Sequence, residues 1–220
     1  MIIPGPASLA TIACALCVGV LLAGERAQRD ALRFAAKPLA SALFLVVAWL
    51  AVRGRPTTGF DACVLAGLAL GAAGDVALLW KRGFLPGLVA FLLGHLAYVA
   101  AVHERLPAGE WLGAAGALAI VPVVLSLAIL ARLWPHLGAM RGPVIAYVAV
   151  ITAMVIAAIA LGRADTGRSA QRFLAGAILF FASDVSVARD KFVAESFANK
   201  AWGLPAYYAG QLLIAWSLSA

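Results

Sequence analysis

Residues 67–98 read GLALGAAGDVALLWKRGFLPGLVAFLLGHLAY, two apolar runs joined by a basic turn at 81–83. Each run carries one ionisable residue, Asp75 in the first and His95 in the second. An ionisable side chain within a membrane helix costs about 2.5–3.5 kcal/mol on insertion scales, so by default it marks a functional site. The stretch therefore predicts a membrane-embedded helical hairpin that carries a polar site.

The whole chain has the composition of a membrane protein. Of its 220 residues, 64% are hydrophobic and 12% are charged, about half the charged share of a soluble domain. The net charge of +7 comes from Lys and Arg between the apolar runs, where such residues set topology and meet anionic headgroups. The chain has no Lys/Arg-rich helix and no aromatic–basic platform. We therefore expect membrane lipids, and no nucleic acid, as partners.

Apolar windows of about 15–21 residues predict eight membrane-spanning helices. Charged or Pro/Gly-rich breaks separate the windows, and no break is long enough for a soluble domain. The first window has no positive leading region and no clear processing site, so we interpret it as a retained helix. Residues 1–220 are therefore expected to form one all-α transmembrane domain. The windows are 3–23, 36–52, 60–80, 85–102, 111–130, 143–161, 173–188 and 204–218.

Lys and Arg are distributed unequally between the two sides of this domain. Eleven follow the first, third, fifth and seventh windows, and six lie on the other side. The positive-inside rule then places both termini outside the cytoplasm. We expect an integral protein of the inner (plasma) membrane, and the sequence leaves its oligomeric state open.

A second stretch, about a hundred residues further on, has similar features. Ser183-Asp184-Val185 parallels Gly74-Asp75-Val76: each lies near the end of an apolar run and is followed by a basic turn and a Phe. Such a pattern suggests an internal repeat of two parallel halves, four helices each, related by an axis along the membrane normal. Few residues are identical, so chance similarity between two membrane helices is the alternative.

The similar depth of Asp75 and Asp184 in the membrane predicts a common site, whether or not the internal repeat is real. Asp75 and Asp184 lie about five and four residues before the ends of their windows, within about 8 Å of one membrane face at 1.5 Å per residue. Other polar side chains lie within a few turns of that face, whereas the opposite half is nearly all Ala, Leu, Val and Ile. We expect one polar pocket that opens toward one leaflet and contains His95 as well as Lys37, Tyr147, Lys191, Tyr207, Tyr208 and Gln211.

Two carboxylates with a His, tyrosines and a Lys are the parts of an acid/base hydrolase, in which one acid donates a proton and the other activates water. A nucleophilic triad is disfavoured because Ser183 adjoins Asp184 and points to another helix face, and no G-x-S-x-G is present. For either Asp, a structural ion pair with Lys37 or Lys191 is the alternative.

A metal site is a further alternative, built from His95, Asp75 and Asp184. The other two histidines, His103 and His136, lie near loops and outside the polar cluster. We therefore expect neither a resident metal nor a cofactor.

The ordered set of these residues resembles the YhhN/TMEM86 family of eight-helix membrane proteins, which includes the lysoplasmalogenases. The resemblance spans the second to the eighth window and adds Tyr98 to the candidate substrate-binding residues. One departure is Gly210, where the family often has Ala. The matching residues are Lys37-Pro38, Gly74-Asp75, Phe84, Gly94-His95-x-x-Tyr98, Tyr147, Ser183-Asp184, Lys191-Phe192 and Tyr208-x-x-Gln211.

The resemblance implies hydrolysis of the vinyl-ether bond of a lysoplasmalogen to a fatty aldehyde and a glycerophospho-base. Protonation of the β-carbon of an enol ether gives an oxocarbenium ion that water attacks, as in two-carboxylate glycoside hydrolysis. Asp75 and Asp184 would supply the acid and the carboxylate in either order. His95 would orient water, tune the neighbouring Asp or donate the proton, and Lys37 and Lys191 would meet the phosphate.

Three other functions use the same pocket. Intramembrane Asp and His relays, and parallel repeats, also occur in proton-coupled transporters. A lipid-binding protein without catalysis would not need two buried acids. An enzyme acting on a different lyso-ether or enol-ether lipid is equally compatible with the residues.

Overall fold

Every regular element in the described part of the chain, residues 5–219 of a computed structural model, is a helix. Residues 3–4 of the first predicted window lie outside this part. Short 3-10 turns flank or join several helices. The α-helices are α1 (Pro6–Arg26), α2 (Asp30–Val52), α3 (Gly59–Ala77), α4 (Phe84–Arg105), α5 (Trp111–Ala115), α6 (Ile120–Leu133), α7 (Arg141–Ala164), α8 (Arg168–Phe192) and α9 (Phe197–Trp216).

The all-α prediction is confirmed. Seven helical segments of the described chain are long and apolar enough to cross a membrane, among them the segment Ala108–His136, which contains α5 and α6. Helix α9 matches the eighth predicted window but begins with a polar turn that holds Asn199 and Lys200, and its crossing stays a prediction. The internal repeat also stays a prediction.

The window 111–130 lies within Ala108–His136, a segment long and apolar enough to cross a membrane, but the helix in this window is interrupted. Helix α5 ends at Ala115, and Gly116 adopts a φ of +57° that residues with a side chain rarely take. A 3-10 turn (η2, Gly116–Ala119) then leads into α6. Pro122 lies in the first turn of α6 and has no backbone N–H. The first N–H groups of a helix have no acceptor within that helix, so a helix that begins at Ile120 loses no hydrogen bond at this proline.

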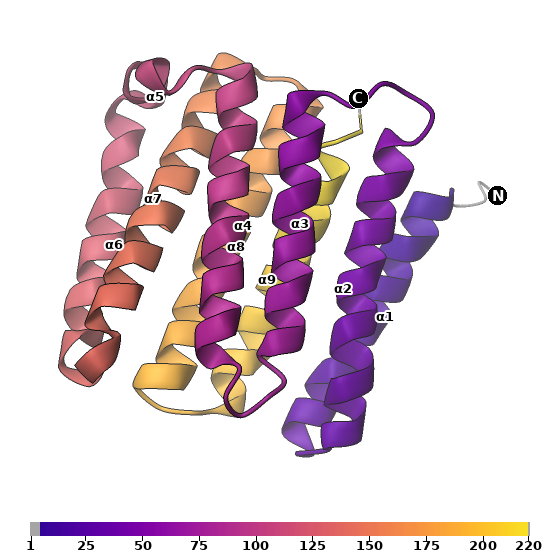
Figure 1. Ribbon diagram of the computed structural model, residues 1–220, viewed down its shortest axis with the longest axis vertical. Coiled ribbons are helices and arrows are strands. Elements are labelled where there is room, and N and C mark those ends of the chain that lie inside the picture. Colours follow the sequence, from indigo (N-terminus) through magenta and orange to yellow (C-terminus); the bar gives the residue numbers. More distant parts are fainter. Residues whose placement is uncertain (1–4, 220) are drawn as a thin grey trace.

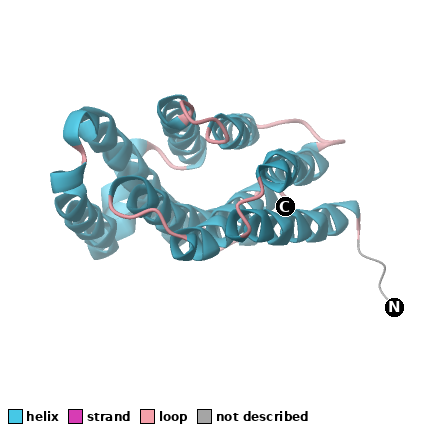
Figure 2. Cartoon of the chain, turned by 90° about the horizontal axis from the view of Figure 1, so that it is seen from below, coloured by secondary structure: helices cyan, strands magenta, loops and turns pink. Residues whose placement is uncertain are grey.

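Six helices form a closed ring. In the order α2, α3, α4, α7, α8 and α9 each helix contacts the next, and α9 returns to α2 (Figure 1, Figure 2). Helix α1 packs outside the ring against α2 and α9, and α5 and α6 pack outside it against α7. Gly176 and Gly210 allow α8 and α9 to approach closely, since a Cβ at Gly210 would lie 2.9 Å from the Gly176 carbonyl oxygen.

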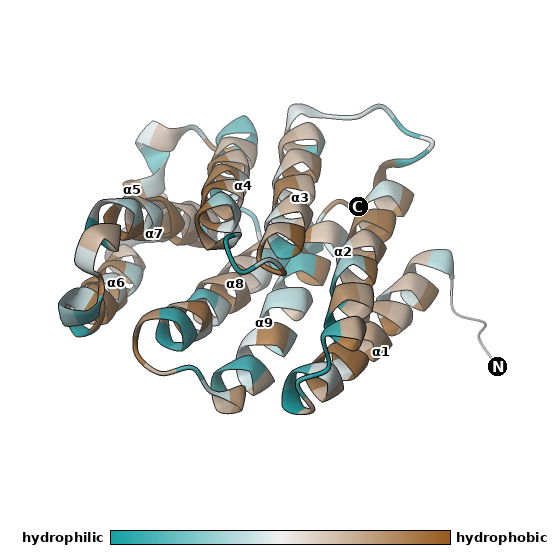
Figure 3. Ribbon diagram, turned by 60° about the horizontal axis from the view of Figure 1, so that its bottom comes forward, coloured by the Kyte–Doolittle hydropathy of each residue, from teal (hydrophilic) through white to brown (hydrophobic). Residues whose placement is uncertain are grey.

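The turns after α1, α3, α6 and α8 lie at one end of the ring, which we call the basic end (Figure 1). It carries the eleven Lys and Arg residues counted on one side of the membrane. Hydrophobic residues dominate the lengths of the helices, and hydrophilic ones gather toward the helix ends and turns (Figure 3). Which side of a membrane the basic end faces stays a prediction.

At the opposite end, one buried acid has a structural role. Asp61, in the first turn of α3, accepts hydrogen bonds of 2.7 and 2.9 Å from both terminal nitrogens of Arg55. The hydrogen bond to Asp61 raises the pKa of the Arg55 guanidinium. Arg55 also donates to the Leu218 carbonyl at 2.9 Å, so the pair ties the α2–α3 loop to the end of α9.

Candidate active site

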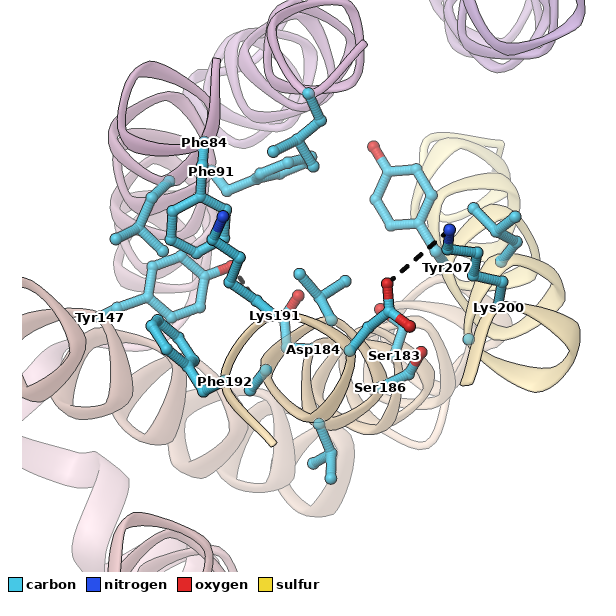
Figure 4. A pocket seen from close by; sticks show the side chains of 18 of the residues that line it. Phe84, Phe91, Tyr147, Ser183, Asp184, Ser186, Lys191, Phe192, Lys200 and Tyr207 are labelled. Carbon is cyan, nitrogen blue, oxygen red and sulfur yellow. Dashed lines mark hydrogen bonds and ion pairs between the residues drawn. The ribbon is translucent and has the colours of Figure 1, made fainter. Parts of the chain in front are cut away.

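The ring encloses a cavity of about 770 Å³ that reaches the turns of the basic end. All six ring helices contribute to its lining, and so do Glu25 of α1 and three residues of α6, because the cavity extends beyond the ring toward α6. Asp75 and Asp184, 109 positions apart (184 − 75), both face it. Figure 4 shows Tyr147 and Asp184 on one side of this space and Tyr207 on the other. Of the predicted site residues, those that line the cavity are Lys37, Asp75, Tyr147, Asp184, Lys191 and Tyr207.

Asp75 lies in the last turn of α3 and is only 2% exposed. Its Oδ2 atom accepts hydrogen bonds of 2.7 Å from the hydroxyls of Ser41 and Tyr207. The ammonium of Lys37 lies 3.4 Å from Oδ1. A buried charge is tolerated when it is paired and hydrogen-bonded, and Asp75 has one cation and two hydroxyl donors to support its carboxylate form.

Asp184 has a different environment on α8. Its Oδ2 atom accepts one hydrogen bond, 2.8 Å from the Tyr147 hydroxyl, and the side chain is 19% exposed. Among the described residues no Lys or Arg lies at ion-pair distance from it. The nearest ring nitrogen is Nε2 of His95, at 3.7 Å. The two acids therefore share a cavity, but only Asp75 has a cation beside it.

His95 lies behind Asp184 and does not line the cavity. Its Nδ1 atom is 2.6 Å from the Phe91 carbonyl oxygen, which can only accept, so Nδ1 carries the hydrogen. The side chain is 1% exposed, and Nε2 has no hydrogen-bond partner in the described part of the chain. The imidazole ring is held between Phe180 and Tyr147, with ring centroids 4.5 and 5.3 Å away. An unpaired Nε2 thus points toward Asp184.

Three residues expected to contact substrate are instead fully buried behind the cavity wall. The Tyr98 hydroxyl donates to Gln211 at 2.8 Å, and the Gln211 amide donates to the Tyr207 hydroxyl at 3.0 Å. Tyr207 in turn donates to Asp75, so these side chains form one directed hydrogen-bond chain. Tyr208 donates to the Lys37 carbonyl oxygen at 3.2 Å. These residues position the groups around Asp75 and are not on the cavity surface.

Lys191 is exposed at the basic end. Its ammonium lies 4.8 Å from the centre of the Phe84 ring, and Phe84 meets Phe192 edge to face at 5.7 Å. This contact joins the start of α4 to the end of α8 across the cavity mouth (Figure 4). Within residues 5–219, no acidic side chain lies at ion-pair distance from Lys191. Lys37, by contrast, forms with Asp75 the ion pair that was an alternative interpretation of the sequence.

The sequence did not identify two features of the site. Ser41 hydrogen-bonds to Asp75, and its position four residues after Lys37, on the same face of α2, was an available signal. At the mouth, Glu25 is buried between Arg33, at 2.7 Å, and Lys200, at 3.1 Å. Glu25 and these two partners come from three different helices, so no local spacing in the sequence indicates the cluster. Within residues 5–219, no three His, Cys, Asp or Glu side chains group as metal ligands would.

A closed ring of apolar helices around a cavity lined by two carboxylates defines a polytopic α-helical integral membrane protein with polar groups among its helices. The chain belongs to the YhhN family, whose model matches residues 32–218. No solved structure matches the chain.

Named relatives agree with this family. The chain is 34% identical to lysoplasmalogenase TMEM86A of Bos taurus over 160 residues, which cover 70% of this chain and 64% of the relative. It is 33% identical to a lysoplasmalogenase of Mycobacterium bovis over 159 residues, 67% of this chain and 56% of the relative. The matches thus span less than two thirds of these two relatives. The membrane protein YhhN of Escherichia coli O157:H7 is 29% identical over 210 residues, 93% of this chain and 96% of the relative.

Proposed function

We propose that this protein hydrolyses the vinyl-ether bond of lysoplasmalogen-type lipids to a fatty aldehyde and a glycerophospho-base. The names of the relatives at about one-third identity support the reaction class. The observation that carries the proposal is the pair of unlike carboxyl groups, Asp75 and Asp184, facing one cavity inside a ring of membrane helices.

We assign the roles of proton donor and carboxylate from the surroundings of the two acids. Asp184, with one hydroxyl donor and no Lys or Arg beside it, is the proton donor. Asp75, with Lys37, Ser41 and Tyr207 around it, is the carboxylate at the start of the reaction. This division follows the general pattern in which two acids of one site are separated by their environments.

The reaction begins when Asp184 transfers its proton to the β-carbon of the alkenyl chain. The double-bond electrons form the new C–H bond, and an oxocarbenium ion develops between the α-carbon and the ether oxygen. The Asp75 carboxylate stabilises this cation and accepts a proton from the attacking water. In the resulting hemiacetal, the Asp75 carboxyl returns this proton to the glycerol oxygen, which leaves as the alcohol. The hemiacetal hydroxyl gives its proton to the Asp184 carboxylate as the aldehyde carbonyl forms, so both acids regain their starting protonation states.

His95 is a positioning residue in this scheme. A hydrogen on Asp184 would find its acceptor in the unpaired Nε2 atom, 3.7 Å from Oδ2. Such a contact fixes the position of the carboxyl group and holds its proton between turnovers. The ring itself, being buried, does not touch the lipid.

The cavity also suits an amphiphile. Its volume is within the roughly 300–1,000 Å³ of small-molecule sites. Its mouth carries Lys81 and Lys191, which offer point charges to a phosphate. A transporter is less well supported, since beyond His95 the ring is filled by packed aromatic residues, such as Phe60 and Phe173 at 5.8 Å.

The test compares three single-chain phospholipids that share a headgroup and chain length. They carry a 1-alkenyl, a saturated 1-alkyl or a 1-acyl linkage. Mass spectrometry of products from the purified protein should detect the aldehyde and the glycerophospho-base from the alkenyl lipid alone. No cleavage of the alkenyl lipid, or release of fatty acid from the acyl lipid, would overturn the proposal.

A further inference from the structure

Among the residues that the structure describes, the buried apolar side chains form two separate clusters. The main core runs through the helix ring and includes Phe91, Ile151 and Tyr207. A second, smaller cluster joins α6, α7 and the end of α8 near the basic end, around Leu133 and Val144. A domain of this size usually has one contiguous core with minor satellites. The cavity lies between the two clusters, and residues of both line it.

Toward α6 the cavity lining changes from polar to apolar. We call this part the apolar arm. Three faces enclose it, each with positions three or four residues apart, which therefore lie on one side of their helix. Seven positions of α6 along the arm correspond to about 10 Å at 1.5 Å per residue. Its lining residues are Ser126, Ile129 and Leu133 from α6, Val144, Val148 and Ile151 from α7, and Phe181, Val185 and Ala188 from α8.

The polar atoms at the far end of the arm are already paired. The hydroxyls of Ser126 and Thr152 lie 2.6 Å apart, and Thr152 donates to the Val148 carbonyl at 2.6 Å. The arm therefore presents hydrocarbon to its occupant along its whole length. Its near end adjoins Asp184, which follows Phe181 and precedes Val185 and Ala188 on the same stretch of α8.

We propose that the apolar arm between α6, α7 and α8 binds the hydrocarbon chain of a single-chain lipid. The occupant is a hydrocarbon because the walls offer no free polar group, and burying each methylene there contributes about 0.8 kcal/mol. Continuity with the basic mouth supports a lipid with its headgroup at Lys191 and its chain in the arm. The first chain carbons then lie beside Asp184. Only the position of the first chain carbons beside Asp184 rests on the proposed function.

Binding can be measured without turnover. The probe is a saturated 1-alkyl lysophospholipid that carries a diazirine in its chain, added to the full-length protein in phosphatidylcholine vesicles and photolysed. Mass spectrometry should locate the label on Ile129, Leu133 or Val148, and excess unlabelled saturated lipid should compete it away. Label confined to outward lipid-facing residues, without competition, would overturn the proposal.

Ile129→Trp fills the arm, and Leu127→Trp is its matched control because Leu127 is exposed on the outer face of the same helix. Ile129→Trp should lower about tenfold the labelling that excess unlabelled lipid competes away. A tenfold loss corresponds to the binding contribution of roughly two buried methylenes of the lipid chain. Leu127→Trp should leave it unchanged. Equal labelling of the two variants contradicts the arm site. Val148→Phe replaces Ile129→Trp if the latter is not monodisperse.

The two proposals fail separately. Because the probe has no vinyl ether, labelling of the arm is unaffected if the protein is not a hydrolase. If alkenyl lipids are cleaved while the label falls outside the arm, the hydrolase stands and only the chain site is wrong.

Discussion

The Oδ2 atom of Asp184 lies 3.7 Å from Nε2 of His95, a buried nitrogen that has no hydrogen-bond partner. Because Nδ1 donates to the Phe91 carbonyl, Nε2 carries the lone pair of the ring and can act as an acceptor. A buried polar atom without a partner costs about 1–3 kcal/mol. A proton on Asp184 relieves that cost, and the same proton is the one that the proposed reaction needs.

Replacing His95 should therefore affect turnover and not substrate binding. His95→Phe keeps the ring volume but removes the acceptor. It should lower kcat with KM nearly unchanged, by less than the roughly 10²-fold expected for a catalytic carboxylate. His95→Gln, which retains an acceptor oxygen, should recover part of kcat. Steady-state kinetics on an alkenyl lysophospholipid decide the point, and a rise in KM with normal kcat would return His95 to the binding surface.

The hydroxyl of Tyr207 donates directly to Asp75 at 2.7 Å, whereas that of Tyr98 donates to Gln211 one step further back. Tyr207→Phe should lower kcat because the carboxylate loses one of its two hydroxyl donors. Tyr98→Phe deletes the same atom from another buried tyrosine of the same hydrogen-bond chain, so it is the matched control. It should cost about 1 kcal/mol of stability and leave kcat near normal. The reverse order of effects in kinetics and thermal unfolding would contradict the proposed role of Asp75.

Replacing Lys37 and replacing Lys191 should change different kinetic constants. Lys37→Ala removes the cation beside Asp75 and should mainly lower kcat. Lys191→Ala removes an exposed charge at the mouth and should raise KM more than it lowers kcat, since a phosphate contact is similar in ground and transition states. Both variants are measured on one alkenyl lysophospholipid. A pure kcat loss in Lys191→Ala would assign that residue to the chemistry instead.

Orientation in the membrane can be tested with reporter fusions. If the basic end faces the cytoplasm, as the positive-inside rule predicts, a reporter in the turn 81–84 should be cytoplasmic and one at the C-terminus extracytoplasmic. A control fusion in the α2–α3 loop should match the C-terminal one. The opposite pattern would show that the cavity opens toward the outer leaflet.

Much of the fold followed from the sequence because the membrane imposes simple rules. Apolar runs of sufficient length marked the helices, and the ends of the α3 and α8 windows placed Asp75 and Asp184 at similar depth. The break at Gly116 was missed because a single glycine within an apolar run usually leaves a helix intact. Only the tertiary structure shows that this glycine takes a positive φ.

The sequence could not show how the environments of the two acids differ. It also could not show which polar side chains line the cavity and which lie behind its wall. The motifs around Asp75 and Asp184 are alike, and their difference comes from residues on other helices, namely Lys37 and Ser41 for the first and Tyr147 for the second. Likewise, Gln211 and Tyr207 are one helical turn apart, yet only Tyr207 reaches the cavity. Which residues face the cavity depends on how six helices close the ring.

The most direct test of the two-carboxylate account is the turnover number of Asp184→Asn on an alkenyl lysophospholipid, measured beside Asp75→Asn and the double variant. Each change keeps the size of the side chain and removes its charge and proton. Each should cost at least about 10²-fold, and the double variant should be little worse because the pair acts as a unit. Asp61→Asn, a buried acid at the opposite end of the ring, is the control and should retain turnover. Near-normal turnover in a folded, monodisperse Asp184→Asn protein would contradict the account.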